Sequence, residues 1–579
     1  MRTVLHQLGR YKKDTVICVL MTTLEVVMDI LLPFITAIII DRGLSAANMS
    51  VVWRYGIIMV VMAFLGLVFG AGAGKYAASA SSGFAANLRE AIYSNIQTFS
   101  FSNIDKFSVP GLVTRMTTDV TNVQNAFMML IRMAVRAPLT LVFSYIMCLI
   151  ISPRMSLMFL IALVFLVVVL GVIMITAMKI FNDVFHRYDD LNASVQENVS
   201  AIRVVKAFVR EDFEEQKFSK ASKTLYKLFV KAESLLAINN PAMMLAIYFC
   251  IMLVSWLGAH YIVAGSMTTG ELTSLFSYVL SLMMSLMMLS MIVVMISISL
   301  ASIRRIAEVL RETPDLSDPE NPVMEVKDGS IDFDHVQFAY KHGSGKNTLS
   351  DIDLHIHSGE TIGVIGGTGS GKSSLVNLIC RLYDVDEGAV RVGGVDVRKY
   401  DMEVLRNQVS VVLQKNTLFS GSILDNLRWG NPQATEEECI EACKSACADE
   451  FIDRMPDGYH THIERGGANV SGGQKQRLCI ARALLKKPKV LILDDSTSAV
   501  DTATDAKIRE AFQKKIPGPT KIIIAQRVSS VENADRILVL DNGRINGFDT
   551  HENLLKTNAI YSEIYESQVQ GGGDFDQPA

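Results

Sequence analysis

A glycine-rich segment in the second half of the chain has the residue types and spacing of a phosphate-binding loop. It reads Gly366-Gly367-Thr368-Gly369-Ser370-Gly371-Lys372-Ser373-Ser374, which is the pattern G-x-x-x-x-G-K-[ST]. Residues 361–365 predict a buried strand before it and residues 375–382 a helix after it. In such a loop the backbone N–H groups face inward and the helix start adds partial positive charge. Lys372 would then reach the β- and γ-phosphates of ATP and Ser373 would hold Mg²⁺; the strand-loop-helix context disfavours a glycine-rich turn without a ligand.

A second helix start also has anion-binding character. The residues Val470-Ser471-Gly472-Gly473-Gln474 precede a strongly predicted helix at 475–485. Ser471 is a natural N-cap, and Gly472 and Gly473 let the backbone approach a ligand. Since one chain rarely needs two γ-phosphate sites, this second helix start is expected to serve the ATP of another molecule.

Polar side chains follow several predicted strands. The apolar residues 490–493 are followed by Asp494, which suits Mg²⁺ bound through water, and by Asp495, which stands where a carboxylate would polarise an attacking water. Gln414 ends the strand at 409–413, from where an amide can reach a metal-bound water or the γ-phosphate, and Gln526 ends the strand at 521–525. Upstream of the loop, the ring of Tyr340 could stack on adenine.

Composition indicates a membrane region beside this soluble one. Of 579 residues, 50% are hydrophobic and 20% charged, and the mean hydropathy is +0.29, more apolar than is usual for a soluble enzyme. The net charge of −4 argues against nucleic acid as the main partner.

Eight cysteines without a C-x-x-C pair indicate reduced, cytosolic thiols. Cys439, Cys443 and Cys447 recur on one helix face and are interpreted as a packed apolar stripe, because no fourth metal ligand is evident.

Six apolar segments in the first half can cross a bilayer, for which about 20 residues suffice. They lie near 15–40, 55–74, 137–152, 155–178, 242–264 and 272–300. The long loops 75–136 and 179–241 are helical in pattern and rich in Lys and Arg, so they and both termini are expected in the cytoplasm, without a cleavable signal peptide. Residues 1–13 predict a short amphipathic helix on the membrane surface.

Each long loop turns at an aromatic segment, residues 99–103 and 207–211, which could contact another domain or simply close a helix hairpin. Within the spans, Glu25 and Asp29 lie four residues apart. They are either a site for cationic substrates or a structural pair with Arg132 or Arg136. The last span is rich in methionine, and Met284, Met287 and Met291 could line a polyspecific cavity or merely pack.

The domain boundaries follow from these patterns. Residues 1–312 form an α-helical transmembrane domain with six helices and long cytoplasmic extensions, and residues 313–329, with Pro314 and Pro319, form a linker. Residues 330–568 alternate strands and helices and predict an α/β domain with a mainly parallel sheet. The tail at 569–579 has no packing pattern and is expected to be disordered.

The nucleotide motifs, together with Ser498-Ala499-Val500-Asp501, occur in the order and rough spacing of an ATP-binding cassette. The chain, over about residues 1–568, resembles an ABC exporter half-transporter of the type IV fold, and V-S-G-G-Q is the signature specific to that superfamily. The resemblance implies a dimer with two ATP molecules, each between the phosphate loop of one chain and the signature of the other. It also implies that the segments near Phe101 and Phe208 are coupling helices, the second contacting the opposite cassette.

Two positions depart from the family pattern, which usually has Glu where this chain has Asp495 and His where it has Gln526. Together they predict an ATP site that binds but hydrolyses slowly. The intact signature is useful only to a partner with a competent loop. The chain therefore resembles the degenerate-site subunit of a heterodimeric multidrug exporter in a bacterial cytoplasmic membrane; a slow homodimer is the alternative. Lipid or peptide flipping, an ATP-gated channel-like role and import remain open as other functions.

Overall fold

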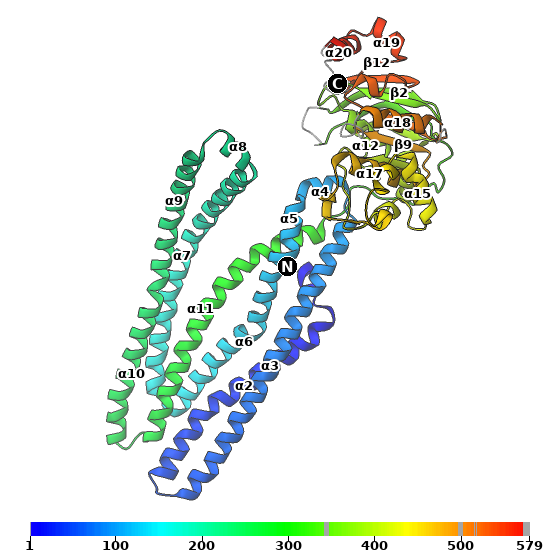
Figure 1. Cartoon of the computed structure of the whole chain (residues 1–579). Coiled ribbons are helices and arrows are strands. Elements are labelled where there is room, and N and C mark those ends of the chain that lie inside the picture. Colours follow the sequence, from blue (N-terminus) through cyan, green and yellow to red (C-terminus); the bar gives the residue numbers. More distant parts are fainter. Residues whose placement is uncertain (1, 341–346, 496–501, 515, 517, 571–579) are drawn as a thin grey trace. The chain divides into compact units, whose positions relative to one another are not determined.

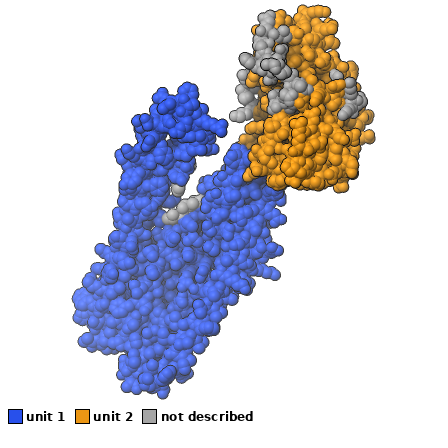
Figure 2. Space-filling view, viewed as in Figure 1, with its two compact units in different colours: residues 1–97, 108–312 blue, residues 98–107, 313–579 orange. Residues whose placement is uncertain are grey.

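The computed structural model describes residues 2–340, 347–495, 502–514, 516 and 518–570. Its contacts divide the chain into two units (Figure 2). Unit 1 comprises Met1–Gln97 and Ser108–Glu312, and unit 2 comprises Thr98–Phe107 and Thr313–Ala579. The predicted Ser498–Asp501 motif and the end of the predicted disordered tail, 571–579, lie outside the described residues.

In the described residues of unit 1, every regular element is a helix (Figure 1). Its helices are α1 (Arg2–His6), η1 (Gly9–Tyr11), α2 (Lys12–Ile38), η2 (Ile39–Leu44), α3 (Met49–Gln97), α5 (Val109–Thr114), η3 (Arg115–Asp119), α6 (Val120–Ile151), α7 (Pro153–Ser200), α8 (Ile202–Ala207), α9 (Glu211–Ala237), α10 (Asn239–Val263) and α11 (Thr269–Arg311). Six helical stretches of the described chain are long and apolar enough to span a membrane, which confirms the predicted number. The 49 residues of α3 extend about 70 Å at about 1.5 Å per residue, more than twice the roughly 30 Å of a hydrocarbon core.

Helices α2, α3, α6 and α11 pack together, whereas α7 and α9 run side by side with α8 at their tip (Figure 1). None of the residues of α8 is buried, and the next two, Phe208 and Val209, are 74% and 81% exposed. The segment 1–13, predicted as one helix on the membrane surface, is instead broken: Val4 and Leu8 are buried, α1 packs on α11, and Asn87 of α3 donates to Gln7 O at 2.8 Å.

Unit 2 is an α/β domain preceded in sequence by one short helix. Its helices are α4 (Phe101–Phe107), α12 (Lys372–Ile379), η4 (Val397–Lys399), α13 (Met402–Gln408), α14 (Ile423–Arg428), α15 (Glu436–Ser445), α16 (Asp449–Ile452), η5 (Gly458–His460), η6 (Arg465–Gly467), α17 (Gly472–Leu484), α18 (Thr502–Lys514), η7 (Val528–Ser530), α19 (His551–Thr557) and α20 (Ala559–Gln570). Helix α20 includes residues 569 and 570, the first two residues of the segment predicted as a tail.

The described strands of unit 2 form three sheets. They are β1 (Ile331–Phe338), β2 (Leu349–Ile356), β3 (Thr361–Ile365), β4 (Glu387–Val392), β5 (Val395–Asp396), β6 (Val409–Val412), β7 (Gly421–Ser422), β8 (His462–Ile463), β9 (Val490–Asp494), β10 (Thr520–Ile524), β11 (Arg536–Asp541) and β12 (Arg544–Asp549). The six-stranded sheet has the order β12-β11-β3-β10-β9-β6, and all its neighbours except β12 run parallel. The order of the antiparallel sheet is β2-β1-β4-β5, and β7 pairs with β8.

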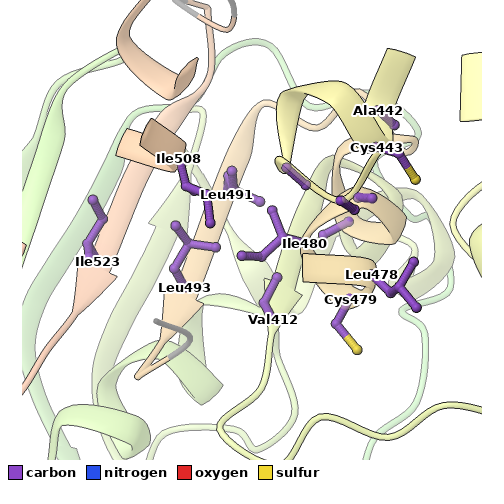
Figure 3. Close-up of a cluster of buried hydrophobic side chains, with 14 of the residues drawn as sticks. Val412, Ala442, Cys443, Leu478, Cys479, Ile480, Leu491, Leu493, Ile508 and Ile523 are labelled. Atoms are coloured by element: carbon purple, nitrogen blue, oxygen red, sulfur yellow. The ribbon is translucent and has the colours of Figure 1, made fainter. Parts of the chain in front are cut away.

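Apolar strands of the large sheet are fixed by helices that cover them. Figure 3 shows Ile480 of α17 between that helix and the strands β6 and β9. The side chains that meet there are Val412, Ile480, Leu491, Leu493, Ile508 and Ile523. Each such buried side chain contributes about 1.5–3 kcal/mol. Cys439 and Cys443 are fully buried in the same core and Cys447 packs against it, as the interpretation of a packed apolar stripe predicts.

Helix α4 packs with the α/β domain although the sequence places it within the predicted transmembrane domain of residues 1–312. Tyr383 Oη donates to Asp105 Oδ2 at 2.8 Å, and the rings of Phe101 and Tyr383 lie 6.1 Å apart. The predicted linker 313–329 also packs on the α/β domain. Val326 is 1% exposed, and Val323 forms an isolated β-bridge with Tyr400.

Candidate nucleotide site

The phosphate-loop candidate connects β3 to α12, at the carboxyl edge of the parallel strands. Gly371 has φ +99°, and a Cβ on it would lie 2.7 Å from Leu349 Cδ2. Gly366 has φ +156°, and a Cβ there would lie 2.2 Å from Leu540 O. Both positions therefore require glycine, for backbone conformation and for space. The loop carries Thr368, Gly369 and Ser370 between them, and α12 begins at Lys372.

Lys372 folds back over its own loop. Its Nζ donates to Gly366 O at 2.7 Å and to Gly367 O at 2.8 Å. Burial lowers the pKa of this ammonium, and the carboxylates of Asp494 and Asp495 oppose that shift. Because a charged phosphate oxygen is a stronger acceptor than a carbonyl, Lys372 is placed to exchange these two contacts for a polyphosphate.

The pair formed by Ser373 and Asp494 fits a magnesium ion. Ser373 Oγ donates to Asp494 Oδ1 at 3.3 Å, and Asp494 is 6% exposed at the end of β9. Burial raises the pKa of the Asp494 carboxyl, and neighbouring Asp495 adds to the rise. A hydroxyl and a carboxylate are oxygen ligands of the kind Mg²⁺ prefers, and a cation beside this carboxylate would favour its charged form.

Two glutamine side chains, each following a different strand, meet the carboxylate of Asp495. Gln526 Nε2 donates to Asp495 Oδ2 at 2.8 Å, and Gln414 Nε2 approaches the same oxygen at 3.3 Å. Asp495 has φ +46°, a left-handed conformation, and its N–H donates to Ile524 O at 3.0 Å. The backbone of β9 and β10 therefore holds this carboxylate, and two neutral amides satisfy one of its oxygens.

Tyr340 lies beside the loop and is 46% exposed. Its Oη lies 3.0 Å from Ser374 Oγ, and its ring meets that of Tyr383 edge-on at 5.1 Å. Tyr383, and its link to Asp105 of α4, were missed in the sequence. The two tyrosines are 43 positions apart and share no local pattern, so only the fold brings them together.

The second candidate motif forms the start of α17 as a closed capping box. Gln474 N–H donates to Ser471 Oγ at 3.3 Å, and Gln474 Oε1 accepts from Ser471 N–H at 2.9 Å. Gly472 and Gly473 form the first turn. Within the described residues, no hydrogen bond joins this motif to the phosphate loop of the same chain.

In unit 1 both membrane carboxylates pair with one arginine. Arg136 Nη1 contacts Glu25 Oε1, and Arg136 Nη2 contacts Asp29 Oδ2 at 2.7 Å. Gly70 makes room, since a Cβ there would lie 3.0 Å from Glu25 Oε1. The structural pair considered in the sequence is thus present, with Arg136 as the partner.

Along α11, the side chains of Met284, Met287 and Met291 are exposed.

Comparison with known proteins identifies both regions. Residues 15–306 match the family described as ABC transporter transmembrane region, and residues 349–498 match the family described as ABC transporter. The chain is 35% identical over 568 residues to the ABC transporter ATP-binding protein YfiB of Bacillus subtilis, covering 98% of each. It is 33% identical over 463 residues to an ATP-dependent lipid A-core flippase of Desulfotalea psychrophila, covering 79% of this chain and 80% of that one. A solved bacterial Atm1-family ABC exporter with ATP bound superposes with a TM-score of 0.82 at 24% identity, covering 97% and 99% of the chains, and so shows the same fold.

Proposed function

The chain belongs to the ABC transporters and has a transmembrane region and an ATP-binding domain in one polypeptide. On this premise we propose that it is one subunit of a heterodimeric efflux transporter. The transporter exports amphipathic drugs or toxins across a bacterial cytoplasmic membrane, with both termini of this subunit in the cytoplasm. Its own ATP site retains nucleotide and hydrolyses it slowly. The partner subunit carries the catalytic Glu and the switch His.

The environment of Asp495 carries this proposal. A general base must come within about 2.6–3.2 Å of the group it deprotonates, and Asp is one methylene shorter than the Glu usual at this position. Its Oδ2 is engaged by Gln526 and Gln414, both neutral. Gln526 cannot add the positive charge that stabilises a developing anion. Both differences lower the rate of hydrolysis and leave binding residues untouched.

The remaining residues act in binding. Lys372 and the backbone N–H groups of 366–374 hold the phosphates, and the ring of Tyr340 stacks on adenine. Ser373, Asp494 and Gln414 are the residues that would hold Mg²⁺, which when bound supplies positive charge to the phosphate oxygens. Ser471–Gln474 complete the partner's site, because the N-terminus of α17 presents backbone donors to the γ-phosphate there. ATP-driven closure of the two ATP-binding domains then opens the membrane cavity outward, and hydrolysis at the partner's site resets it.

Two surfaces of unit 1 support a dimeric exporter. The exposed tip formed by α8, Phe208 and Val209 is suited to dock on the partner's ATP-binding domain. The exposed methionines Met284, Met287 and Met291 offer a soft, adaptable surface to amphipathic substrates. Glu25 and Asp29 remain candidates for substrate contact, since the Asp29 side chain is 44% exposed beside Arg136.

The test is ATPase activity of the purified full-length chain, alone and co-expressed with a candidate partner. The chain alone is expected to hydrolyse ATP at least tenfold more slowly than the pair, because two catalytic positions are altered. The double substitution Asp495→Glu and Gln526→His should raise turnover at this site, whereas Asp495→Asn should not. Rapid hydrolysis by the unaltered chain alone would overturn the heterodimer proposal in favour of a homodimer.

A second candidate function is flipping of lipids, favoured by the 33% identity to a lipid A-core flippase. It uses the same nucleotide chemistry and differs only in what enters the membrane cavity. Peptide export or ATP gating of a passive pathway has no comparable support.

A further inference from the structure

The last described helix, α20, reaches the segment that carries Gln526. Gln568 Nε2 donates to Gln526 O at 2.9 Å, and Gln568 Oε1 accepts from Val528 N–H at 2.8 Å. One side-chain amide therefore pairs with the C=O of one residue and the N–H of the residue two positions on. A neighbouring parallel strand would form the same two hydrogen bonds to an extended segment. Here the side chain of Gln568 forms them, just beyond the end of β10.

Helix α20 has a fixed position from which to do this. Tyr561 is fully buried, and its Oη lies 2.7 Å from His551 Nδ1. Asn558 Oδ1 accepts from Tyr561 N–H at 2.9 Å, which caps the first turn. Tyr561 shares the core of the domain with Val528 and Val531, so the helix and the segment after β10 pack against common neighbours.

The clamped backbone carries a side chain of the nucleotide site. Gln526 offers its C=O to Gln568 and its amide Nε2 to Asp495 Oδ2, at 2.9 Å and 2.8 Å. A continuous chain of hydrogen bonds thus runs from α20 to Asp495. Because a side-chain hydrogen bond weakens steeply outside its narrow range of distance and angle, displacement of the Gln526 backbone by an ångström would break the contact with Asp495.

We infer that Gln568 is a positioning residue of the nucleotide site: through the backbone of Gln526 it keeps that amide on Asp495 and so keeps the site closed around bound ATP. This inference rests on the proposed function, in which the site retains nucleotide. The inference goes beyond that function because it makes α20 an element that sets the dissociation rate of the nucleotide. Removing the clamp frees residues 526–528, releases Asp495 and speeds nucleotide loss.

The experiment measures retention of radiolabelled ATP by the full-length chain in Mg²⁺, after a chase with unlabelled ATP. Gln568→Ala is expected to raise the dissociation rate about three- to tenfold, in line with the loss of one or two hydrogen bonds. Gln568→Glu keeps the acceptor for Val528 N–H but loses the donor to Gln526 O, and should have at least as large an effect. Ser567→Ala on the same helix is the matched control, since its hydroxyl donates within α20 to Ile564 O at 2.9 Å, and it should retain ATP as the unaltered chain does.

A double-substitution cycle separates positioning from general support of the fold. In a Gln526→Ala background, Gln568→Ala should change the dissociation rate by less than about 1.5-fold, because the side chain it positions is gone. The inference is overturned if Gln568→Ala raises the dissociation rate as much in that background as in the unaltered chain. It is also overturned if Gln568→Ala retains ATP as long as the unaltered chain does. Neither result would affect the proposed function. If the unaltered chain retains no more ATP than Lys372→Ala, the retaining site itself is absent and the proposed function falls with it.

Discussion

Asp494 and Asp495 are adjacent carboxylates that the fold places in different surroundings. Asp494 ends β9, is 6% exposed and bonds to Ser373. Asp495 turns into a left-handed conformation and accepts from the amides of two glutamines. Burial without a full charge partner disfavours the ionised form of Asp494. The carboxylate that we propose as a Mg²⁺ ligand is therefore expected to destabilise the fold when no cation is bound.

This predicts a gain in stability from removing a site residue. In the ligand-free protein, Asp494→Asn should raise Tm by about 1–3 °C near neutral pH, because it removes a buried charge that the Ser373 hydroxyl and the Lys372 ammonium offset only in part. In the same variant, addition of Mg-ATP should no longer raise Tm. Differential scanning fluorimetry with and without Mg-ATP measures both effects, and Ser373→Ala is a control that keeps the carboxylate.

The pH dependence has a definite sign. The folded-state pKa of Asp494 is raised above its ordinary value near 3.8, so between the two values the folded state holds more protons than the unfolded state. Stability contributed by this group then rises as pH falls through the raised pKa. The Tm advantage of Asp494→Asn should accordingly shrink as the pH is lowered toward 4, and an advantage that grows on acidification would contradict the assignment.

At this scale sequence reasoning found the residue types but not their contacts. The spacing of 366–374 and the strand ends at Gln414, Asp495 and Gln526 were readable because each depends on a few neighbouring positions. That Gln414 and Gln526 share one oxygen of Asp495, or that Gln568 clamps Gln526, depends on sheet order and helix packing. Such contacts leave no local signature.

Among the elements of unit 1, η3 and α11 are joined by a buried carboxylate. Asp119 is 1% exposed; its Oδ2 accepts from Arg305 Nε at 2.8 Å, and its Oδ1 accepts from Ser302 Oγ at 2.8 Å. Asp119 also precedes α6, so the junction holds three helical elements together. A π-type turn at Arg115–Asp119 presents the carboxylate to α11, and such turns often mark functional positions in helices.

Loss of that carboxylate should loosen the junction strongly. Asp119→Ala is expected to destabilise the protein by about 2–4 kcal/mol, because it removes the buried hydrogen bonds that the carboxylate accepts from Ser302 and Arg305. Ser302→Ala should cost only about 1 kcal/mol. The matched control is Asp190→Ala, whose side chain is 69% exposed in a surface pair with Arg187 and whose loss should change stability by less than about 0.5 kcal/mol. Thermal unfolding in detergent gives the ranking; equal Tm for the Asp119 and Asp190 variants would refute it.

Elements were predictable where their cause is local. Six apolar runs of roughly bilayer length predicted the six helices that are long and apolar enough to span a membrane. The alternation of strands and helices predicted the mainly parallel sheet. The association of α4 with unit 2 was not predictable, since its contacts are with Tyr383 and with Thr313 and Asp315 near the start of the ATP-binding domain. The segment at 1–13 was misplaced for the same reason: its apolar side chains suit a membrane surface or a protein surface equally, and Val4 and Leu8 are buried in protein.

For the whole molecule, the open question between drug export and lipid flipping has a direct assay. Inside-out vesicles containing the chain and the proposed partner subunit should accumulate a cationic amphipathic dye when Mg-ATP is added, because the exposed methionines offer an adaptable surface and Asp29 a carboxylate. ADP in place of ATP is the control. ATP-dependent movement of labelled phospholipid without dye uptake would instead favour the second candidate, and dye movement only down its gradient would contradict a pump.

Helix α4 belongs by its contacts to unit 2, while the chain on both sides of it belongs to unit 1. The ATP-binding domain is therefore assembled from two pieces of the chain, the second beginning roughly 200 residues after the first. At about 5–20 residues per second, the ribosome finishes α4 about 10–40 s before Thr313 emerges. Because the chain on both sides of α4 belongs to unit 1, the packing of α4 links the folding of the ATP-binding domain to the folding of the helical unit.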